Sequence, residues 1–118
     1  MILGIGTDLI YKEKVKNIYS KYKERFLKKI LSVEEHKIFY ELSEEKKINF
    51  LCSSFASKEA LVKALGSGFR DIYPSDITLK KNNLGKPSLI SNSLKDLDCH
   101  LSITNTDSYT LSFVVLEK

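Results

Sequence analysis

The first ten residues of the chain alternate between two sets of side chains, and this alternation predicts a β-strand over residues 1–10. Successive side chains of a strand point to opposite faces. One face would carry Leu3, Ile5, Thr7 and Leu9, and the other would carry Ile2, Gly4, Gly6, Asp8 and Ile10. The second face therefore places a carboxylate beside two glycines, which leave room for a ligand or for a closely approaching backbone.

Helical periodicity follows the strand. The lysine-rich residues 12–31 have apolar side chains at helical spacing and predict one or two amphipathic helices. Ser32 and Glu35 form a capping box, which predicts a short helix that ends near Leu42. Ser43 opens a further helix, which we expect to run to about Leu65 and to end at the glycines of residues 66–68.

The last third of the chain predicts two hairpins. Residues 76–90 have turn chemistry at Asn82–Gly85, and Pro87 limits the second strand. Residues 99–118 form the second hairpin, with its turn at Asn105–Ser108. A strand, then helices, then hairpins indicate a single α+β domain over residues 1–118. We expect a mainly antiparallel sheet packed against a long buried helix and shorter helices.

Composition narrows the class of partner. The chain has 118 residues, of which 42% are hydrophobic, so it can bury the core of one domain. Nineteen basic residues against 15 acidic ones give a net charge of +4. A basic surface indicates an acidic partner, which could be a nucleic acid, an anionic protein or a phosphorylated small molecule.

The cellular setting follows from what the sequence lacks. The longest apolar runs are far too short to span a bilayer, and the N-terminus has no signal-peptide pattern. We expect a cytoplasmic protein without a membrane partner, and a plastid-type organelle stays open if a transit peptide was removed. Cys52 and Cys99 have no metal-ligand spacing and are expected to be buried free thiols.

The long predicted helix has two charged residues on its apolar side. Glu59 lies in the middle of the apolar stripe, and Lys63 lies on its edge. The stripe itself consists of Ile48, Leu51, Cys52, Phe55 and Val62. A carboxylate in such a stripe is costly unless it is paired, protonated or bound to a cation. A Glu–Lys pair on a solvent face is the simpler alternative, but the stripe favours a functional role.

Asp8 is the expected complement of Glu59. Two carboxylates in one pocket suit Mg²⁺, which binds one or two carboxylates together with substrate phosphates. Lys63 would then contact phosphate or handle a proton near the metal. For Asp8 alone, a cap at the end of the strand is an equal alternative. His100 and Ser102 share a strand face without an acidic third residue, which favours a polar solvent face.

Five motifs together resemble one enzyme family. They are GIGTDL at 4–9, RFLKKILS at 25–32, FASKEALVKALGSG at 55–68, GKP at 85–87 and HLSI at 100–103. In order and spacing they are similar to those of the holo-acyl-carrier-protein synthases, the short 4′-phosphopantetheinyl transferases. The resemblance implies transfer of phosphopantetheine from coenzyme A to a serine of apo-acyl carrier protein, with release of adenosine 3′,5′-bisphosphate, in fatty acid biosynthesis. It also implies an α+β homotrimer with active sites between subunits.

The resemblance assigns roles to individual residues. Asp8 and Glu59 would bind Mg²⁺, and together with Lys63, which would contact the phosphates, they form the implied catalytic set. The residues implied to meet the acidic carrier protein are Lys14, Arg25 and Phe26. The residues implied to border coenzyme A, besides Lys63, are Gly66, Ser67, Gly68, Gly85, Lys86, Pro87 and His100.

The chain departs from the family pattern at three positions. Ser54 stands where the family usually has Arg, Asn105 where it has His, and Tyr11 where it has Glu. The first two lie where the family holds the nucleotide end of coenzyme A. Two other functions fit parts of the sequence: a small metal-dependent nuclease that uses Asp8, Glu59 and Lys63, and a non-catalytic RNA-binding module that uses residues 12–29. We expect neither, because the nuclease motif needs a different spacing and the aromatic residues of 12–29 fall at core spacing.

Overall fold

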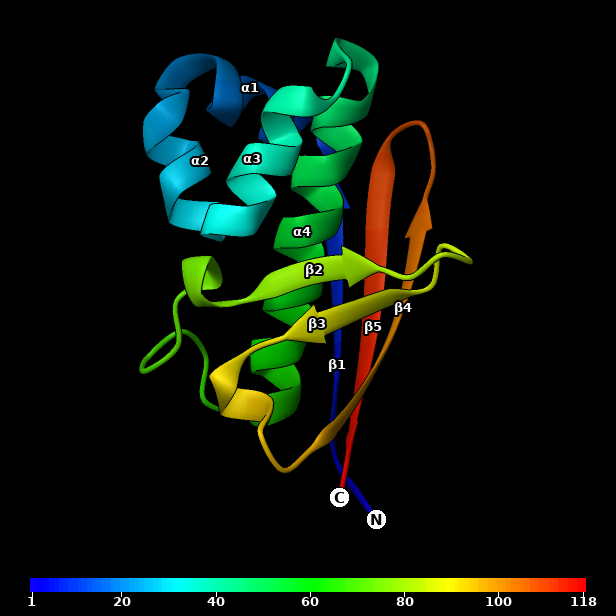
Figure 1. The fold of residues 1–118 in the computed structure, drawn as a ribbon. Coiled ribbons are helices and arrows are strands. Elements are labelled where there is room, and N and C mark those ends of the chain that lie inside the picture. The colour runs from blue at the N-terminus through cyan, green and yellow to red at the C-terminus, as the bar shows by residue number, and fades with distance from the viewer.

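The computed structural model describes all 118 residues, and the order of its elements matches the order predicted from the sequence (Figure 1). The helices are α1 (Lys12–Tyr22), α2 (Glu24–Ile30), α3 (Val33–Glu41) and α4 (Glu44–Leu65). The strands are β1 (Ile2–Tyr11), β2 (Thr78–Lys81), β3 (Pro87–Ile90), β4 (Asp98–Asn105) and β5 (Tyr109–Glu117). Two short 3₁₀ turns, Pro74–Asp76 and Asn92–Leu94, flank the β2–β3 hairpin. None of the helices combines the length and hydrophobicity that a membrane span requires.

The strands form two antiparallel sheets. The larger sheet has the order β1–β5–β4, so the N-terminal strand pairs with the C-terminal strand. Both predicted hairpins are confirmed: β4 pairs with β5, and β2 pairs with β3 as a separate two-stranded sheet. All the pairings are antiparallel, and the predicted α+β class is confirmed.

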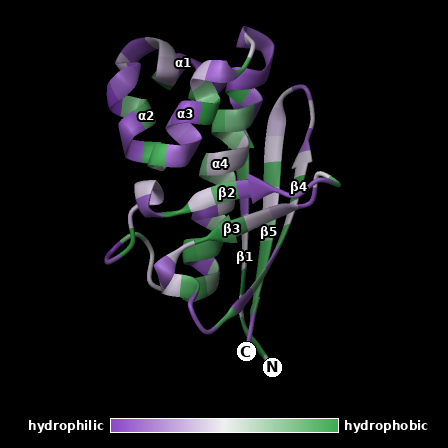
Figure 2. Ribbon diagram, in the orientation of Figure 1, coloured by the Kyte–Doolittle hydropathy of each residue, from purple (hydrophilic) through white to green (hydrophobic).

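Helix α4 is the centre of the fold. In Figure 1 it runs along the three-stranded sheet, which lies behind it, while the β2–β3 hairpin crosses in front of it. Helices α1 to α3 gather around its N-terminal half. Its side chains enter both apolar clusters: Leu51, Cys52 and Ala56 join the cluster under α1–α3, and Ala60, Leu61 and Ala64 join the cluster with the sheets. Figure 2 shows hydrophilic residues over most of α1–α3 and apolar residues along β1 and β5.

Local sequence signals set the ends of the helices. Ser32 and Glu35 form the predicted capping box before α3. Gly66 ends α4 at a φ of 78°, and its N–H donates to the carbonyls of Val62 and Lys63 at 3.0 and 3.2 Å. Ser43 precedes α4 as predicted, but its hydroxyl makes no capping hydrogen bond.

The cysteines are free, as predicted. Cys52 is fully buried, whereas Cys99 on β4 is only partly buried, so the prediction of burial is correct for the first thiol alone. Burial raises the pKa of both thiols to about 11, so neither is a reactive thiolate at neutral pH.

Candidate active site

Gly4 and Gly6 allow β1 to lie very close to α4, and this close approach brings Asp8 next to the helix. A Cβ on Gly4 would lie 2.0 Å from the carbonyl oxygen of Ala64, and a Cβ on Gly6 would lie 1.9 Å from that of Ala60. No side chain fits at either position, so the glycines serve a close backbone contact rather than a ligand. Asp8 follows on the same strand face and therefore also points toward α4.

Lys63 bridges the helix and the strand. Its ammonium donates to Asp8 Oδ1 at 3.1 Å and to the backbone carbonyl of Thr7 at 2.9 Å. The Lys63 side chain is 54% exposed, whereas that of Asp8 is 16% exposed. The ion pair therefore lies at the mouth of the site, where the lysine can exchange Asp8 for an incoming anion.

Glu59 lies one helical turn before Lys63 and completes a group of three. Burial raises the pKa of the Glu59 carboxyl, the negative charge of Asp8 raises it further, and Lys63 acts in the opposite direction. Glu59 is half-buried, in agreement with its predicted place in the apolar stripe, whereas Lys63, which was predicted at the edge of the stripe, is exposed. The convergence of Asp8, Glu59 and Lys63 that the sequence predicted is nevertheless present.

The donor set fits a magnesium ion that keeps most of its coordination for water and substrate. The negative charge of Asp8 helps to raise the pKa of Glu59, and this is the electrostatic condition that a bound cation relieves. No group of three or more His, Cys, Asp or Glu side chains exists in the structure, so the chain offers no all-protein metal cage. Mg²⁺ commonly uses one or two carboxylates plus phosphate oxygens.

A buried charge pair between α4 and α3 was missed by the sequence analysis. Lys58 and Glu35 are both fully buried and form an ion pair. Burial lowers the pKa of Lys58, and Glu35 opposes that shift. One feature of the sequence could have indicated the pair. Small polar residues lie next to Lys58 and one helical turn before it, at Ser57 and Ser54, on a helix that is apolar around most of its circumference.

The remaining predicted coenzyme A residues are spread over three places. Gly66, Ser67 and Gly68 are exposed and directly follow α4, close in sequence to Lys63. Gly85 and Lys86 end the turn between β2 and β3, and Pro87 opens β3. In Figure 1 this hairpin crosses in front of α4, whereas β1 runs behind it. His100 lies on the outer face of β4 and pairs with Glu117 at 3.0 Å. Only the first group directly adjoins the part of α4 that carries Glu59 and Lys63.

A groove of about 640 Å³ lies between α3, α4 and β2. Its walls include Ser53, Asn105 and three lysines, Lys46, Lys80 and Lys81. Apolar side chains of Ile38, Leu42, Phe50 and Leu79 line the rest. The Asn105 amide donates to Ser53 Oγ at 3.2 Å and accepts from the Thr110 hydroxyl at 2.6 Å. Ser54, the other departure from the family pattern, is fully buried beneath this groove.

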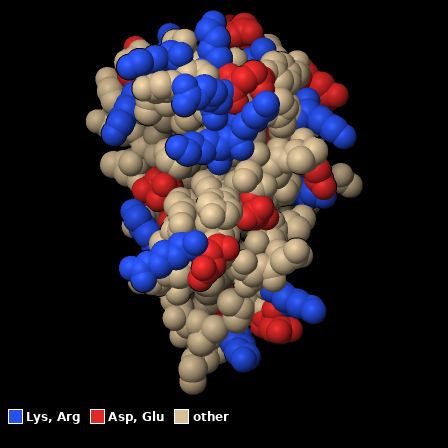
Figure 3. Space-filling view, turned by 90° about the vertical axis from the view of Figure 1, so that its left-hand side faces the viewer, with Lys and Arg blue, Asp and Glu red and all other residues tan.

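The basic residues gather on α1 and α2. Figure 3 shows Lys and Arg side chains concentrated over the end of the molecule that these helices form. Lys14 and Arg25 are exposed there, as a contact with an acidic partner requires. Phe26 is only 9% exposed and packs edge-to-face against Phe55 at 6.4 Å between ring centroids, so it supports α2 from within.

Comparison with known proteins gives this fold and site a class. The model of the 4′-phosphopantetheinyl transferase superfamily matches residues 4–114. The chain belongs to this superfamily, as its motifs predicted.

Individual relatives narrow the class further. The chain is 40% identical over 119 residues to a holo-[acyl-carrier-protein] synthase of Bacillus subtilis and 38% identical over 119 residues to that of a Geobacillus species. Each alignment covers all of this chain and 98% of the relative. The enzyme is of the holo-[acyl-carrier-protein] synthase type.

Solved structures confirm the fold. The holo-acyl-carrier-protein synthase of Bacillus anthracis, solved in complex with CoA (3′,5′-ADP), superimposes with a TM-score of 0.91 at 32% identity. The corresponding enzyme of Neisseria meningitidis gives a TM-score of 0.92 at 31% identity. All of this chain is covered in both cases, with 98% and 100% of the other chains.

Proposed function

We propose that this enzyme transfers 4′-phosphopantetheine from coenzyme A to a serine of apo-acyl carrier protein, depends on Mg²⁺ and releases adenosine 3′,5′-bisphosphate. The observation that carries the proposal is the convergence of Asp8, Glu59 and Lys63 where β1 meets α4. The pyrophosphate of coenzyme A carries two negative charges. The Lys63 ammonium can pair with one of them, and the two carboxylates could hold a metal ion that pairs with the rest. Family membership favours this reaction over the nuclease and the RNA-binding module.

The side chains have separable roles in the proposed reaction. Asp8 and Glu59 would hold the Mg²⁺, which when bound would supply positive charge to offset the charge of the pyrophosphate and of the leaving phosphate. Lys63 leaves Asp8 and donates to a phosphate oxygen. The serine hydroxyl attacks the phosphorus that bears the pantetheine arm, and the bond to the nucleotide breaks. Glu59 accepts the serine proton directly or through a water molecule.

The groove between α3, α4 and β2 supports binding of the nucleotide end of coenzyme A. Lys46, Lys80 and Lys81 surround an opening with apolar walls, a combination that suits an anionic, flat ligand. Asn105 offers an amide there in place of the usual family histidine.

Residues 85–87 support a site completed by a neighbouring chain. In Figure 1 the β2–β3 hairpin crosses in front of α4, whereas β1 runs behind it, so we infer that one chain does not bring the hairpin turn to the Asp8 site. The outer face of the β1–β5–β4 sheet carries a row of exposed apolar side chains. They are Leu3, Ile5, Leu9 and Tyr11 of β1 and Tyr109, Leu111 and Phe113 of β5. An exposed apolar sheet face of this kind is typical of a subunit interface, which supports the proposed homotrimer.

The exposed lysines and arginine of α1 and α2 support recognition of the acidic carrier protein through Lys14 and Arg25. Fatty acid biosynthesis and a cytoplasmic location belong to the same proposal. Detection of the carrier and of this enzyme in one soluble cell fraction tests the location.

The intact mass of an apo-acyl carrier protein tests the reaction. The carrier is incubated with the enzyme, coenzyme A and Mg²⁺, and a gain of one phosphopantetheinyl group is expected. EDTA and Glu59→Ala should each abolish the gain. Glu41→Ala, which removes an exposed glutamate of α3, should leave it intact. No gain with a folded enzyme and several carriers would contradict the proposal.

A further inference from the structure

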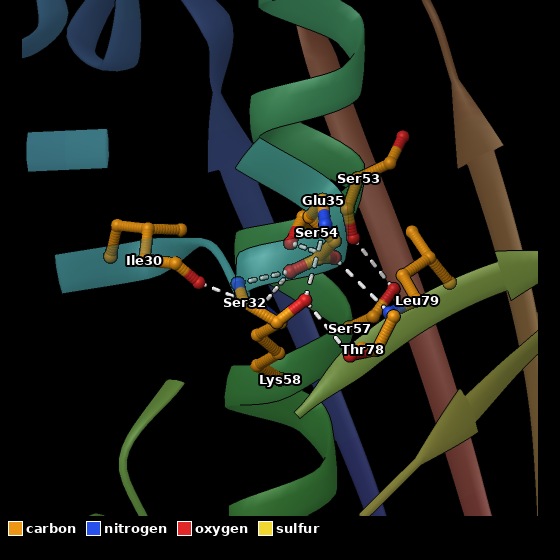
Figure 4. A network of polar contacts seen from close by, with 9 residues as sticks. All are labelled: Ile30, Ser32, Glu35, Ser53, Ser54, Ser57, Lys58, Thr78 and Leu79. Atoms are coloured by element: carbon orange, nitrogen blue, oxygen red, sulfur yellow. Dashed lines mark hydrogen bonds and ion pairs between the residues drawn. The ribbon is translucent and has the colours of Figure 1, made fainter. Parts of the chain in front are cut away.

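The carboxylate of Glu35 is the centre of a buried polar network (Figure 4). Oε1 accepts from the backbone N–H of Ser32 at 2.9 Å and from the ammonium of Lys58. Oε2 accepts from the hydroxyl of Ser54 at 2.7 Å and from the backbone N–H of Leu79 at 3.1 Å. No buried side-chain polar atom in the structure lacks a partner, so the network is fully satisfied.

Together with Lys58, this carboxylate joins four elements. It belongs to α3, and Ser54 and Lys58 belong to α4. Lys58 also donates to the carbonyl of Ile30 at the end of α2, at 2.7 Å. Leu79 belongs to β2, and a second tie runs nearby from the Thr78 hydroxyl to Ser32 Oγ at 2.8 Å. The β2–β3 sheet pairs with no other strand. The hydrogen bonds made by Thr78 and Leu79 therefore join this sheet to the helices.

The residues next to the network line the groove assigned to coenzyme A. Leu79 faces that groove and is followed on β2 by Lys80 and Lys81. Ser53, the neighbour of Ser54, lies on the opposite wall with Asn105. Lys80 is also held by Glu34 of α3, at 3.2 Å. The Glu35 carboxylate therefore links β2, which carries two of the groove's lysines, to the α4 wall of the groove.

A contribution to folding stability does not by itself explain why Glu35 and Lys58 are both charged and buried. Replacing a buried ion pair by apolar side chains of similar volume is often neutral or stabilising, whereas removing one partner is strongly destabilising. A satisfied carboxylate does something an apolar side chain cannot: it fixes the backbone of a neighbouring strand at one position. Binding sites need such support because a small displacement of contact groups weakens binding.

We propose that Glu35, neutralised by Lys58, is a positioning residue for coenzyme A. It holds the amide of Leu79 and thereby fixes the β2 wall of the groove against α4. This inference rests on the proposed function, because it names the support of the same substrate site.

Two matched double variants test the inference. Glu35→Gln with Lys58→Met removes both charges but keeps a side-chain carbonyl that can accept from Leu79. Glu35→Leu with Lys58→Met has similar volume and no acceptor. We expect the Leu variant to raise both the Kd and the KM for coenzyme A about tenfold. Its kcat at saturating coenzyme A and its KM for the carrier should stay within about twofold of wild type. The Gln variant should bind coenzyme A within about threefold of wild type.

Amide exchange at Leu79 gives a readout that needs no substrate. Exchange should accelerate in the Leu variant and stay slow in the Gln variant. Equal coenzyme A affinity in wild type and the Leu variant would overturn the inference while leaving the proposed function intact. Wild-type protein that neither binds coenzyme A nor modifies a carrier would overturn both.

Thr78→Val provides a second route if the Leu variant does not fold. It removes the tie to Ser32 with little change in volume and leaves the charge pair untouched. We expect a smaller rise of the KM for coenzyme A, about threefold, with kcat unchanged. An unchanged KM in folded Thr78→Val would overturn the inference, as would a fall in kcat without a rise in KM.

Discussion

Gly6 passes Ala60 so closely that a Cβ on Gly6 would lie 1.9 Å from the carbonyl oxygen of Ala60. Gly6→Ala must therefore push β1 away from α4 and separate Asp8 from Lys63. We expect a loss of about 3 kcal/mol or more of folding stability, because both contacting groups are backbone and neither can rotate away. Chemical denaturation measures the loss, and transferase activity should fall with it.

Thr7→Ala is the matched control for Gly6→Ala. Thr7 is the next residue of the strand, and its side chain is exposed on the face away from α4. It should keep most of the stability and the Asp8–Lys63 pair. A Gly6→Ala protein as stable and active as Thr7→Ala would show that β1 does not lie in close backbone contact with α4 at Gly6 and Ala60.

Lys63→Ala should separate activity from stability. The ion pair with Asp8 is half-exposed, so its loss should cost no more than about 1 kcal/mol. The transfer rate should fall by about 100-fold or more, because the lysine is the cation proposed to act on the transferred phosphoryl group. Thermal unfolding and initial rates, measured on one preparation, test the two halves. Lys37→Ala on α3 should change neither, and a stable, fully active Lys63→Ala protein would remove Lys63 from the mechanism.

The parts of the fold that the sequence predicts depend on short-range patterns. The alternation along residues 1–10 correctly placed Gly4, Gly6 and Asp8 on one face, because a strand has a strict two-residue period. The Ser32–Glu35 capping box and the Gly66 helix end were also correct, since each depends on residues within one helical turn.

The parts that the sequence did not predict depend on long-range contacts. Glu35 was assigned to the capping box alone, yet its second oxygen bonds Ser54 and Leu79, 19 and 44 residues away. The helical pattern predicted a long buried helix with Glu59 in its apolar stripe, but it gave no sign that Lys58 is buried. The close approach of β1 and the crossing of β2 decide instead that Lys58 is buried and Lys63 is exposed.

Glu59→Gln should stabilise the protein in a pH-dependent way. The raised pKa of Glu59 means that the folded state holds this proton more tightly than the unfolded chain does. The stabilising effect of that proton is complete at acid pH and is lost as pH rises through the raised pKa. Gln cannot ionise, so the variant should be more stable than wild type at pH 8 and closer to it at acid pH.

Thermal unfolding in EDTA across the pH range tests this prediction, because EDTA removes any cation that would favour the ionised carboxylate. Glu41→Gln on α3 is the control, since Glu41 is exposed and lies away from Asp8. A stability difference for Glu59→Gln that grows toward acid pH would contradict the burial of this carboxyl.

Mixed oligomers test whether neighbouring chains share each active site. One variant carries Glu59→Ala, which disables the part of the active site formed by β1 and α4. The other variant carries Lys86→Glu in the β2–β3 turn, which disables the part proposed to come from the neighbouring chain. Each should be inactive alone. If a site takes Glu59 from one chain and Lys86 from its neighbour, chains refolded together at equal ratio should recover about a quarter of the wild-type activity, because one random pairing in four joins two intact halves. A mixture that stays inactive, although wild type refolded in the same way is active, would place both residues in a site made by one chain. Phe113→Asp on the outer sheet face should prevent the recovery by separating the chains, because it puts a charge into an exposed apolar surface.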